Sequence, residues 1–146
     1  MSYLLDTYTF LWMAGDPISL SADVRDIVEE KNHRLYLSAA SAWEIAMLQQ
    51  LKRVELPDVA QRFIAEALQQ LNVLPVSIGF TTALSAATLP LIHRDPFDRL
   101  IIAEALKEKM TVLTKDNLFK SYGVQVLWDA TSSLFYDTKG CSNERY

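Results

Sequence analysis

Residues 34–51, with the sequence RLYLSAASAWEIAMLQQL, place a short β-rich run directly before a helical pattern. Arg34–Ser38 is expected to form a strand, and Ala39–Leu51 a buried helix with apolar residues on nearly every side. A strand that leads straight into a helix is the first half of a βαβ crossover, the unit from which parallel sheets are built. This stretch therefore predicts an α/β domain.

The same alternation of strands and helices continues on both sides of this stretch. The predicted strands are residues 3–5, 34–38, 73–76, 111–114 and 125–127, and the predicted helices are residues 7–14, 22–31, 39–51, 58–71, 80–87 and 96–109. Because helices separate the strands, we expect a three-layer α/β/α sandwich with a mostly parallel central sheet of about five strands. Residues 1–136 are expected to form a single domain, and the polar residues 137–146 a disordered tail.

The composition excludes several classes of protein. The chain has 146 residues, of which 50% are hydrophobic and 22% are charged, and a single Cys, which can form no internal disulfide. No apolar run approaches the roughly 18 residues of a membrane span, and the N-terminus lacks the basic residues of a signal peptide, so we expect a cytoplasmic protein without membrane contact. The net charge of −4 argues against nucleic-acid binding by bulk charge, although a local basic rim is compatible with it.

Four acidic residues stand where the functional crevice of an open parallel sheet lies, beyond the carboxyl ends of the strands. They are Asp6, Glu44, Asp98 and Asp116. Each also has a local explanation: Asp6 can cap the following helix, Ser41 and Glu44 fit an S-x-x-E capping box, Asp98 suits a helix dipole, and Asp116 can begin a turn.

Convergence of the four acids needs a further explanation, because two carboxylates about 4 Å apart repel by roughly 4 kcal/mol at an effective dielectric constant near 20. Such a cluster takes up protons or binds a cation. Carboxylates without Cys or a His pair favour Mg²⁺ or Mn²⁺, which can activate water for phosphodiester cleavage. His33 and His93 are interpreted as structural or loop residues.

Four segments resemble the motifs of PIN-domain ribonucleases, and within these the VapC-type toxins of bacterial toxin–antitoxin pairs. The segments are YLLDT at residues 3–7, SAWEIA at residues 41–46, HRDPFDRLIIAEA at residues 93–105 and LTKD at residues 113–116. The third segment is the most specific, and the resemblance spans residues 3–116.

The resemblance implies that Asp6, Glu44, Asp98 and Asp116 form an acidic quartet that binds one or two Mg²⁺ or Mn²⁺ ions, chiefly through the three aspartates. Glu44 is expected to position or deprotonate the attacking water. Four further residues are expected to support the quartet, namely Thr7, Ser41, Asp95 and Thr114, of which Asp95 already has a sufficient role as a helix cap.

The implied activity is a metal-dependent endoribonuclease that hydrolyses RNA and is the toxin of a toxin–antitoxin pair. Arg94, Arg99 and Lys115 lie within the motifs and are candidates for contact with the RNA backbone. A cognate antitoxin and a homodimer are the implied partners, with apolar surface at Trp12, Trp43 and the helix at residues 58–71 available for either.

Three other functions are possible for acids at the carboxyl end of a parallel sheet. A phosphate-receiving signalling domain needs an Asp after the third strand, where Val76, Ser77 and Ile78 stand instead. A phosphatase of the haloacid dehalogenase type needs Asp-x-Asp after the first strand, which Asp6-Thr7-Tyr8 does not supply. A PIN-fold binding or regulatory module with weak or no catalysis is the alternative that stays open.

Overall fold

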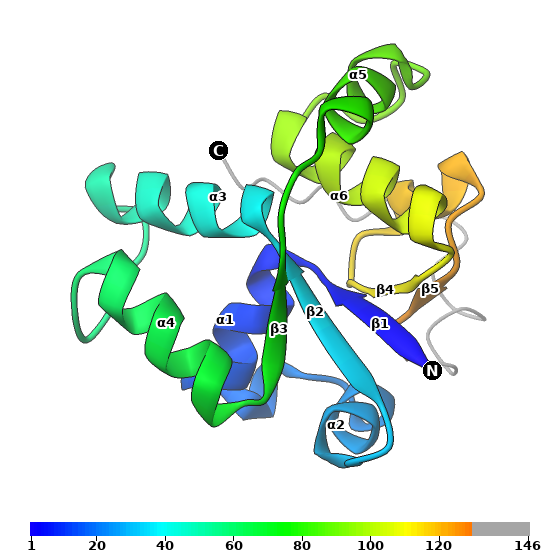
Figure 1. Cartoon of the computed structure of the whole chain (residues 1–146). Coiled ribbons are helices and arrows are strands. Elements are labelled where there is room, and N and C mark those ends of the chain that lie inside the picture. The colour runs from blue at the N-terminus through cyan, green and yellow to red at the C-terminus, as the bar shows by residue number, and fades with distance from the viewer. Residues whose placement is uncertain (130–146) are drawn as a thin grey trace.

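The computed structural model describes residues 1–129, in which a five-stranded sheet lies between helices (Figure 1). The strands are β1 (Ser2–Leu5), β2 (Arg34–Ser38), β3 (Val73–Val76), β4 (Thr111–Leu113) and β5 (Val126–Leu127). The helices are α1 (Thr7–Gly15), α2 (Ala22–Glu29), α3 (Ala39–Gln50), α4 (Ala60–Gln70), α5 (Phe80–Thr88) and α6 (Pro96–Glu108), with short 3-10 helices η1 (Pro17–Ser19) and η2 (Asn117–Tyr122). The predicted tail at residues 137–146 lies outside the described residues.

All neighbouring strands of the sheet run parallel, in the order β3-β2-β1-β4-β5. The predicted fold class is thereby confirmed. The chain adds β2 and β3 on one side of β1 and then crosses over to add β4 and β5 on the other side. The connections therefore diverge at β1, and the gap between the carboxyl ends of β1 and β4 is the topological switch point at which α/β sheets bind ligands.

Alternate residues of β1 face two different hydrophobic clusters, as the two-residue period of a strand requires. Tyr3 and Leu5 pack in the cluster that contains Phe10 of α1 and Ile64 of α4. Leu4 packs in the second cluster, which is built mainly from α6 and the segment around η2. Because both faces of β1 are buried, this strand holds the two halves of the core together.

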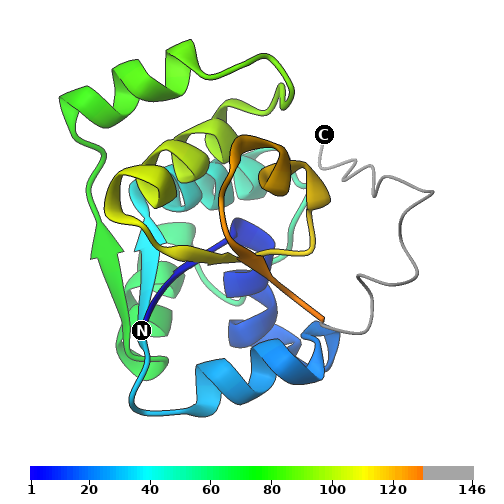
Figure 2. The same cartoon turned by 90° about the vertical axis from the view of Figure 1, so that its right-hand side faces the viewer.

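Helix α5 lies on the outer side of α6, away from the sheet (Figure 2). The two helices are joined by a hydrogen bond in which the buried Thr82 hydroxyl donates to Oε2 of the buried Glu104, at 3.1 Å. Phe80 and Leu84, one turn apart, are exposed on α5. The helix therefore covers α6 and also presents an apolar face to the outside.

The start of α4 differs from the prediction, which began this helix at residue 58. The helix begins at Ala60 instead, after the N-cap Val59. The reason is a contact from α3: the Gln49 side chain accepts a hydrogen bond from the Ala60 N–H at 2.8 Å and donates one to the Asp58 carbonyl at 2.8 Å. Within residues 1–129, no helix combines the length and apolar character needed to cross a membrane.

Candidate active site

Asp6 lies at the carboxyl end of β1 and has two partners on different elements. Its Oδ1 accepts a hydrogen bond from the Thr7 N–H at 2.7 Å, which makes Asp6 the N-cap of α1, as the local explanation predicted. Its Oδ2 accepts a hydrogen bond from the Thr114 hydroxyl at 2.7 Å, just beyond β4. Since Leu5 and Leu113 are register partners, the residues that follow them reach each other directly across the switch point.

Thr114 connects Asp6 to Asp116. The Thr114 hydroxyl oxygen accepts a hydrogen bond from the Asp116 N–H at 3.0 Å while its hydroxyl proton goes to Asp6. Asp116 caps η2 through Oδ1, which accepts from the Leu118 N–H at 2.9 Å. Its other oxygen, Oδ2, lies 2.8 Å from Nε2 of His93. One threonine side chain therefore links the buried Asp6 carboxylate to the backbone of Asp116.

Asp98 enters the site from the first turn of α6 and is fully buried. The helix begins at the N-cap Asp95, whose Oδ1 accepts hydrogen bonds from the N–H groups of Phe97 and Asp98, which agrees with the predicted capping role. Oδ2 of Asp98 lies 3.0 Å from Nε2 of His93. Asp98 and Asp116 therefore meet on one ring nitrogen.

His93, Asp98 and Asp116 form a buried group whose potential ligand atoms all lie within 4.8 Å of one another. Among residues 1–129, this compact group does not include Asp6 or Glu44. The structure thus brings two members of the predicted quartet together, connects Asp6 to them through Thr114, and leaves Glu44 outside this compact group.

Glu44 is fully buried in α3, and the capping box that was its local alternative does not form. The N-cap of α3 is Ser38, whose hydroxyl accepts from the Ala40 N–H at 3.1 Å, so Ser41 lies within the helix. There the Ser41 hydroxyl oxygen accepts a hydrogen bond from the Thr7 hydroxyl at 2.9 Å. Ser41, one turn before Glu44, therefore ties α3 to the residue that follows Asp6.

His93 is the site residue that the sequence analysis missed. Its segment precedes α6 and carries the ring to the carboxylates from outside the sheet. Burial lowers the pKa of His93, but its hydrogen bonds to Asp116 and Asp98 and their negative charges have the larger effect, and they raise the pKa from 6.5 to about 10. The sequence feature that could have identified His93 is its position as the first residue of the most specific motif, five residues before Asp98.

Arg99 differs from its predicted role as an RNA contact. The residue is buried, and its two terminal nitrogens donate hydrogen bonds to four backbone carbonyls, at distances of 2.8 to 3.4 Å. The acceptors belong to residues Ala87, Leu89, Pro90 and His93. The guanidinium is therefore used to hold the segment between α5 and α6. The other two predicted cations, Arg94 and Lys115, are exposed beside the site.

The chain belongs to the PIN-domain family, whose sequence pattern matches residues 3–125. Among curated proteins, it is similar to Ribonuclease VapC22 of Mycobacterium tuberculosis, with 30% identity over 122 residues, which are 82% of this chain and 90% of that protein. The family resemblance deduced from the four motifs is confirmed.

Solved structures support the same fold. One is the VapBC2 complex of Rickettsia felis bound to a DNA fragment from their promoter, with a TM-score of 0.66, 17% identity, and coverage of 88% of this chain and 100% of that one. Another is the DNA-bound VapBC of Salmonella typhimurium, with a TM-score of 0.64, 14% identity, and coverage of 87% and 97%.

Proposed function

We propose that this protein is a metal-dependent endoribonuclease that hydrolyses RNA phosphodiester bonds with an activated water, and that it is the toxin of a toxin–antitoxin pair. The observation that carries the proposal is the buried series of contacts from Asp6 through Thr114 and Asp116 to His93 and Asp98. These contacts lie at the switch point of a parallel sheet, where polar residues serve ligands. The similarity to Ribonuclease VapC22 supports the same class of reaction.

The side chains of the site suit a hard divalent cation, Mg²⁺ or Mn²⁺, present as one or two ions. Asp98 and Asp116 bring buried carboxylate oxygens within 4.8 Å of each other, and their mutual repulsion favours a cation between them. Asp6, Asp98 and Asp116 would hold the cation, with Glu44 contributing directly or through a second ion. When bound, the cation lowers the pKa of water and neutralises charge on the phosphate.

The remaining residues of the site orient the carboxylates or act on the attacking water. Glu44 positions or deprotonates the attacking water. Thr114 keeps the Asp6 carboxylate pointing toward β4, and the hydrogen bond between Thr7 and Ser41 holds α3 against the start of α1. Asp95 supports Asp98 by fixing the first turn of α6.

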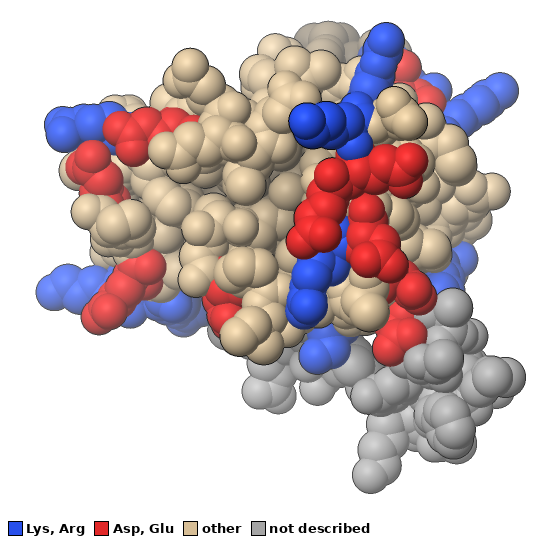
Figure 3. Space-filling view, turned by 90° about the horizontal axis from the view of Figure 1, so that it is seen from below, with Lys and Arg blue, Asp and Glu red and all other residues tan. Residues whose placement is uncertain are grey.

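Arg94 and Lys115 are the cations that we assign to the RNA backbone, because both are exposed and flank buried carboxylates in the sequence. The face of the molecule opposite the site does not favour RNA binding. Seen from below, at the amino ends of the strands, acidic and basic side chains are interspersed (Figure 3). RNA binding is therefore assigned to a local rim beside the site.

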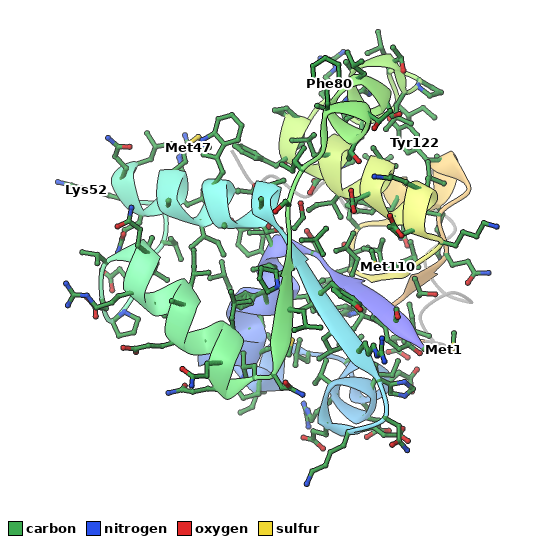
Figure 4. The ribbon with its side chains drawn as sticks, viewed as in Figure 1. Met1, Met47, Lys52, Phe80, Met110 and Tyr122 are labelled. Atoms are coloured by element: carbon green, nitrogen blue, oxygen red, sulfur yellow. The ribbon has the colours of Figure 1, made fainter. Side chains whose placement is uncertain are left out.

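A cognate antitoxin and a second copy of the chain are the proposed protein partners, and the cytoplasm is the proposed location. The solved VapBC complexes support the first partner by analogy. For the second, residues 67–92 contain no Asp, Glu, Lys or Arg, and this segment carries the exposed Phe80, labelled in Figure 4, together with Leu84 and Leu91. Two copies of such a face can meet without charge repulsion.

The test is cleavage of structured and unstructured RNA by the full-length protein, with Mg²⁺ or Mn²⁺ and with EDTA, followed by mapping of the product ends. We expect EDTA to stop cleavage, and the products to carry a 5′-phosphate and a 3′-hydroxyl, because water rather than the 2′-hydroxyl attacks. Asp98→Asn should abolish cleavage, whereas the exposed Asp26→Asn should leave it unchanged.

Two results would contradict the mechanism: cleavage that persists in EDTA, or products with a 2′,3′-cyclic phosphate. Cation binding without cleavage of any RNA would favour the alternative function, a PIN-fold binding or regulatory module.

A further inference from the structure

The side chain of His93 contacts the oxygens of Asp98 and Asp116 that a divalent cation would bind. Nε2 lies 2.8 Å from Oδ2 of Asp116 and 3.0 Å from Oδ2 of Asp98. Both carboxylates are buried, so these oxygens have little access to solvent that could replace the contact. A cation that binds both oxygens must therefore take the position of the imidazole.

The hydrogen bonding of the ring makes Nε2 a donor rather than a metal ligand. Nε2 lies against two carboxylate oxygens, which are acceptors, so Nε2 carries a proton, and Nδ1 faces the Asp95 N–H at 3.2 Å rather than an acceptor. A histidine that ligates a metal usually shows the reverse pattern, in which the other ring N–H donates to an acceptor. The ring therefore supplies hydrogen to the two carboxylates.

The segment that carries His93 is held by side chains of two other elements. Arg99 of α6 donates to the carbonyls on one side of the segment, including the His93 carbonyl at 3.2 Å. The Tyr122 hydroxyl, near the end of η2 (Figure 4), accepts from the Ile92 and His93 N–H groups at 3.1 and 2.6 Å and donates to the Pro90 carbonyl at 2.7 Å. The edge-on contact of His93 with Phe119 limits the ring further.

We infer that His93 is a built-in competitor of the divalent cation: it occupies Asp98 and Asp116 in the cation-free protein and must leave both carboxylates before a cation binds them. Arg99 and Tyr122 are positioning residues that keep the imidazole in this place. The inference rests on the proposed function only in assuming that a divalent cation binds at these carboxylates. Its consequence is that removal of His93 strengthens cation binding.

The experiment is a titration of the full-length protein with Mn²⁺. Binding is measured by calorimetry and by the electron paramagnetic resonance signal of free Mn²⁺. His93→Ala should bind Mn²⁺ at least about tenfold more tightly than the unsubstituted protein, because each hydrogen bond to a charged group is worth about a factor of ten or more. His93→Gln keeps an N–H donor and should lie between the two. Tyr122→Phe removes the hydroxyl contacts to the segment and should tighten binding by a smaller factor.

His33→Ala is the matched control, because His33 pairs with Glu30 and lies outside the site, and its Mn²⁺ affinity should be unchanged. Weaker or equal binding by His93→Ala would overturn the inference, since weaker binding identifies His93 as a ligand. If His93→Ala does not fold, unchanged binding in both His93→Gln and Tyr122→Phe overturns it as well. Absence of Mn²⁺ binding in every variant would overturn the proposed metal dependence too, whereas tight binding that ignores His93 would overturn the inference alone.

Discussion

Replacement of Thr114 by Val tests whether one hydroxyl holds the Asp6 carboxylate and the backbone of Asp116 together. Valine keeps nearly the same shape but removes the donor to Asp6 Oδ2 at 2.7 Å and the acceptor for the Asp116 N–H at 3.0 Å. A hydrogen bond to a charged group contributes about 1.5–3 kcal/mol, and a buried N–H left without its acceptor costs about 1–3 kcal/mol. We therefore expect the free energy of unfolding to fall by about 3–5 kcal/mol in EDTA.

The measurement is urea denaturation followed by circular dichroism. With a slope of about 1–3 kcal/mol per molar urea, this loss lowers the midpoint by roughly 1–5 M without changing the slope. Thr9→Val is a matched buried control, because it removes a single neutral hydrogen bond, to the Leu113 carbonyl at 2.8 Å, and should cost about 1 kcal/mol. A Thr114→Val midpoint no lower than that of Thr9→Val would refute the reasoning, because the carboxylates would then be held by other contacts.

Three further predictions concern charged residues of the site. Arg99→Lys should lower the free energy of unfolding by about 3 kcal/mol in thermal or urea denaturation, because one ammonium group cannot donate to four carbonyls. The control Arg94→Lys should change the free energy of unfolding by less than about 0.5 kcal/mol. Similar losses in the two variants would contradict the structural role of Arg99. Because the pKa of His93 is raised to about 10, its stabilisation of the cation-free protein is complete below about pH 6.5 and is lost as the pH rises to about 10. The difference in free energy of unfolding between the unsubstituted protein and His93→Gln should therefore shrink across that range. A difference that stays constant would argue against the contacts of His93 with the carboxylates. Glu44→Gln should slow RNA cleavage by about 10²–10⁴-fold with an unchanged circular dichroism spectrum, and undiminished cleavage would remove Glu44 from the mechanism.

The order of strands and helices could be predicted from the sequence because apolar patterning decides it locally. The predicted strand at residues 34–38 has the same bounds as β2, and the other strands agree to within a residue or so at each end. The start of α4 could not be predicted, because Gln49 of another helix determines it. Apolar patterning depends on residues that are near in sequence, whereas the contact of Gln49 with the start of α4 forms only when the two helices pack together.

The site shows the same division between local and long-range information. The positions of Asp6, Asp98 and Asp116 after strands or at a helix start follow from the chain order. The roles of His93 and Arg99 do not, since one depends on contact with carboxylates from two elements and the other on carbonyls that are exposed only in a loop. Ser41 fits a local capping pattern as well as a supporting role in the site, and its contact with Thr7 is a long-range one that the sequence does not show.

The central place of β1 has a consequence for biosynthesis. Asp6 and Thr114 are 108 positions apart, so a chain growing on the ribosome exposes its first strand long before the partner that completes the site has been made. Pairing over such a separation is slow to form. A nascent chain interrupted before β4 therefore lacks both the sheet neighbour of β1 and the partner of the Asp6 carboxylate.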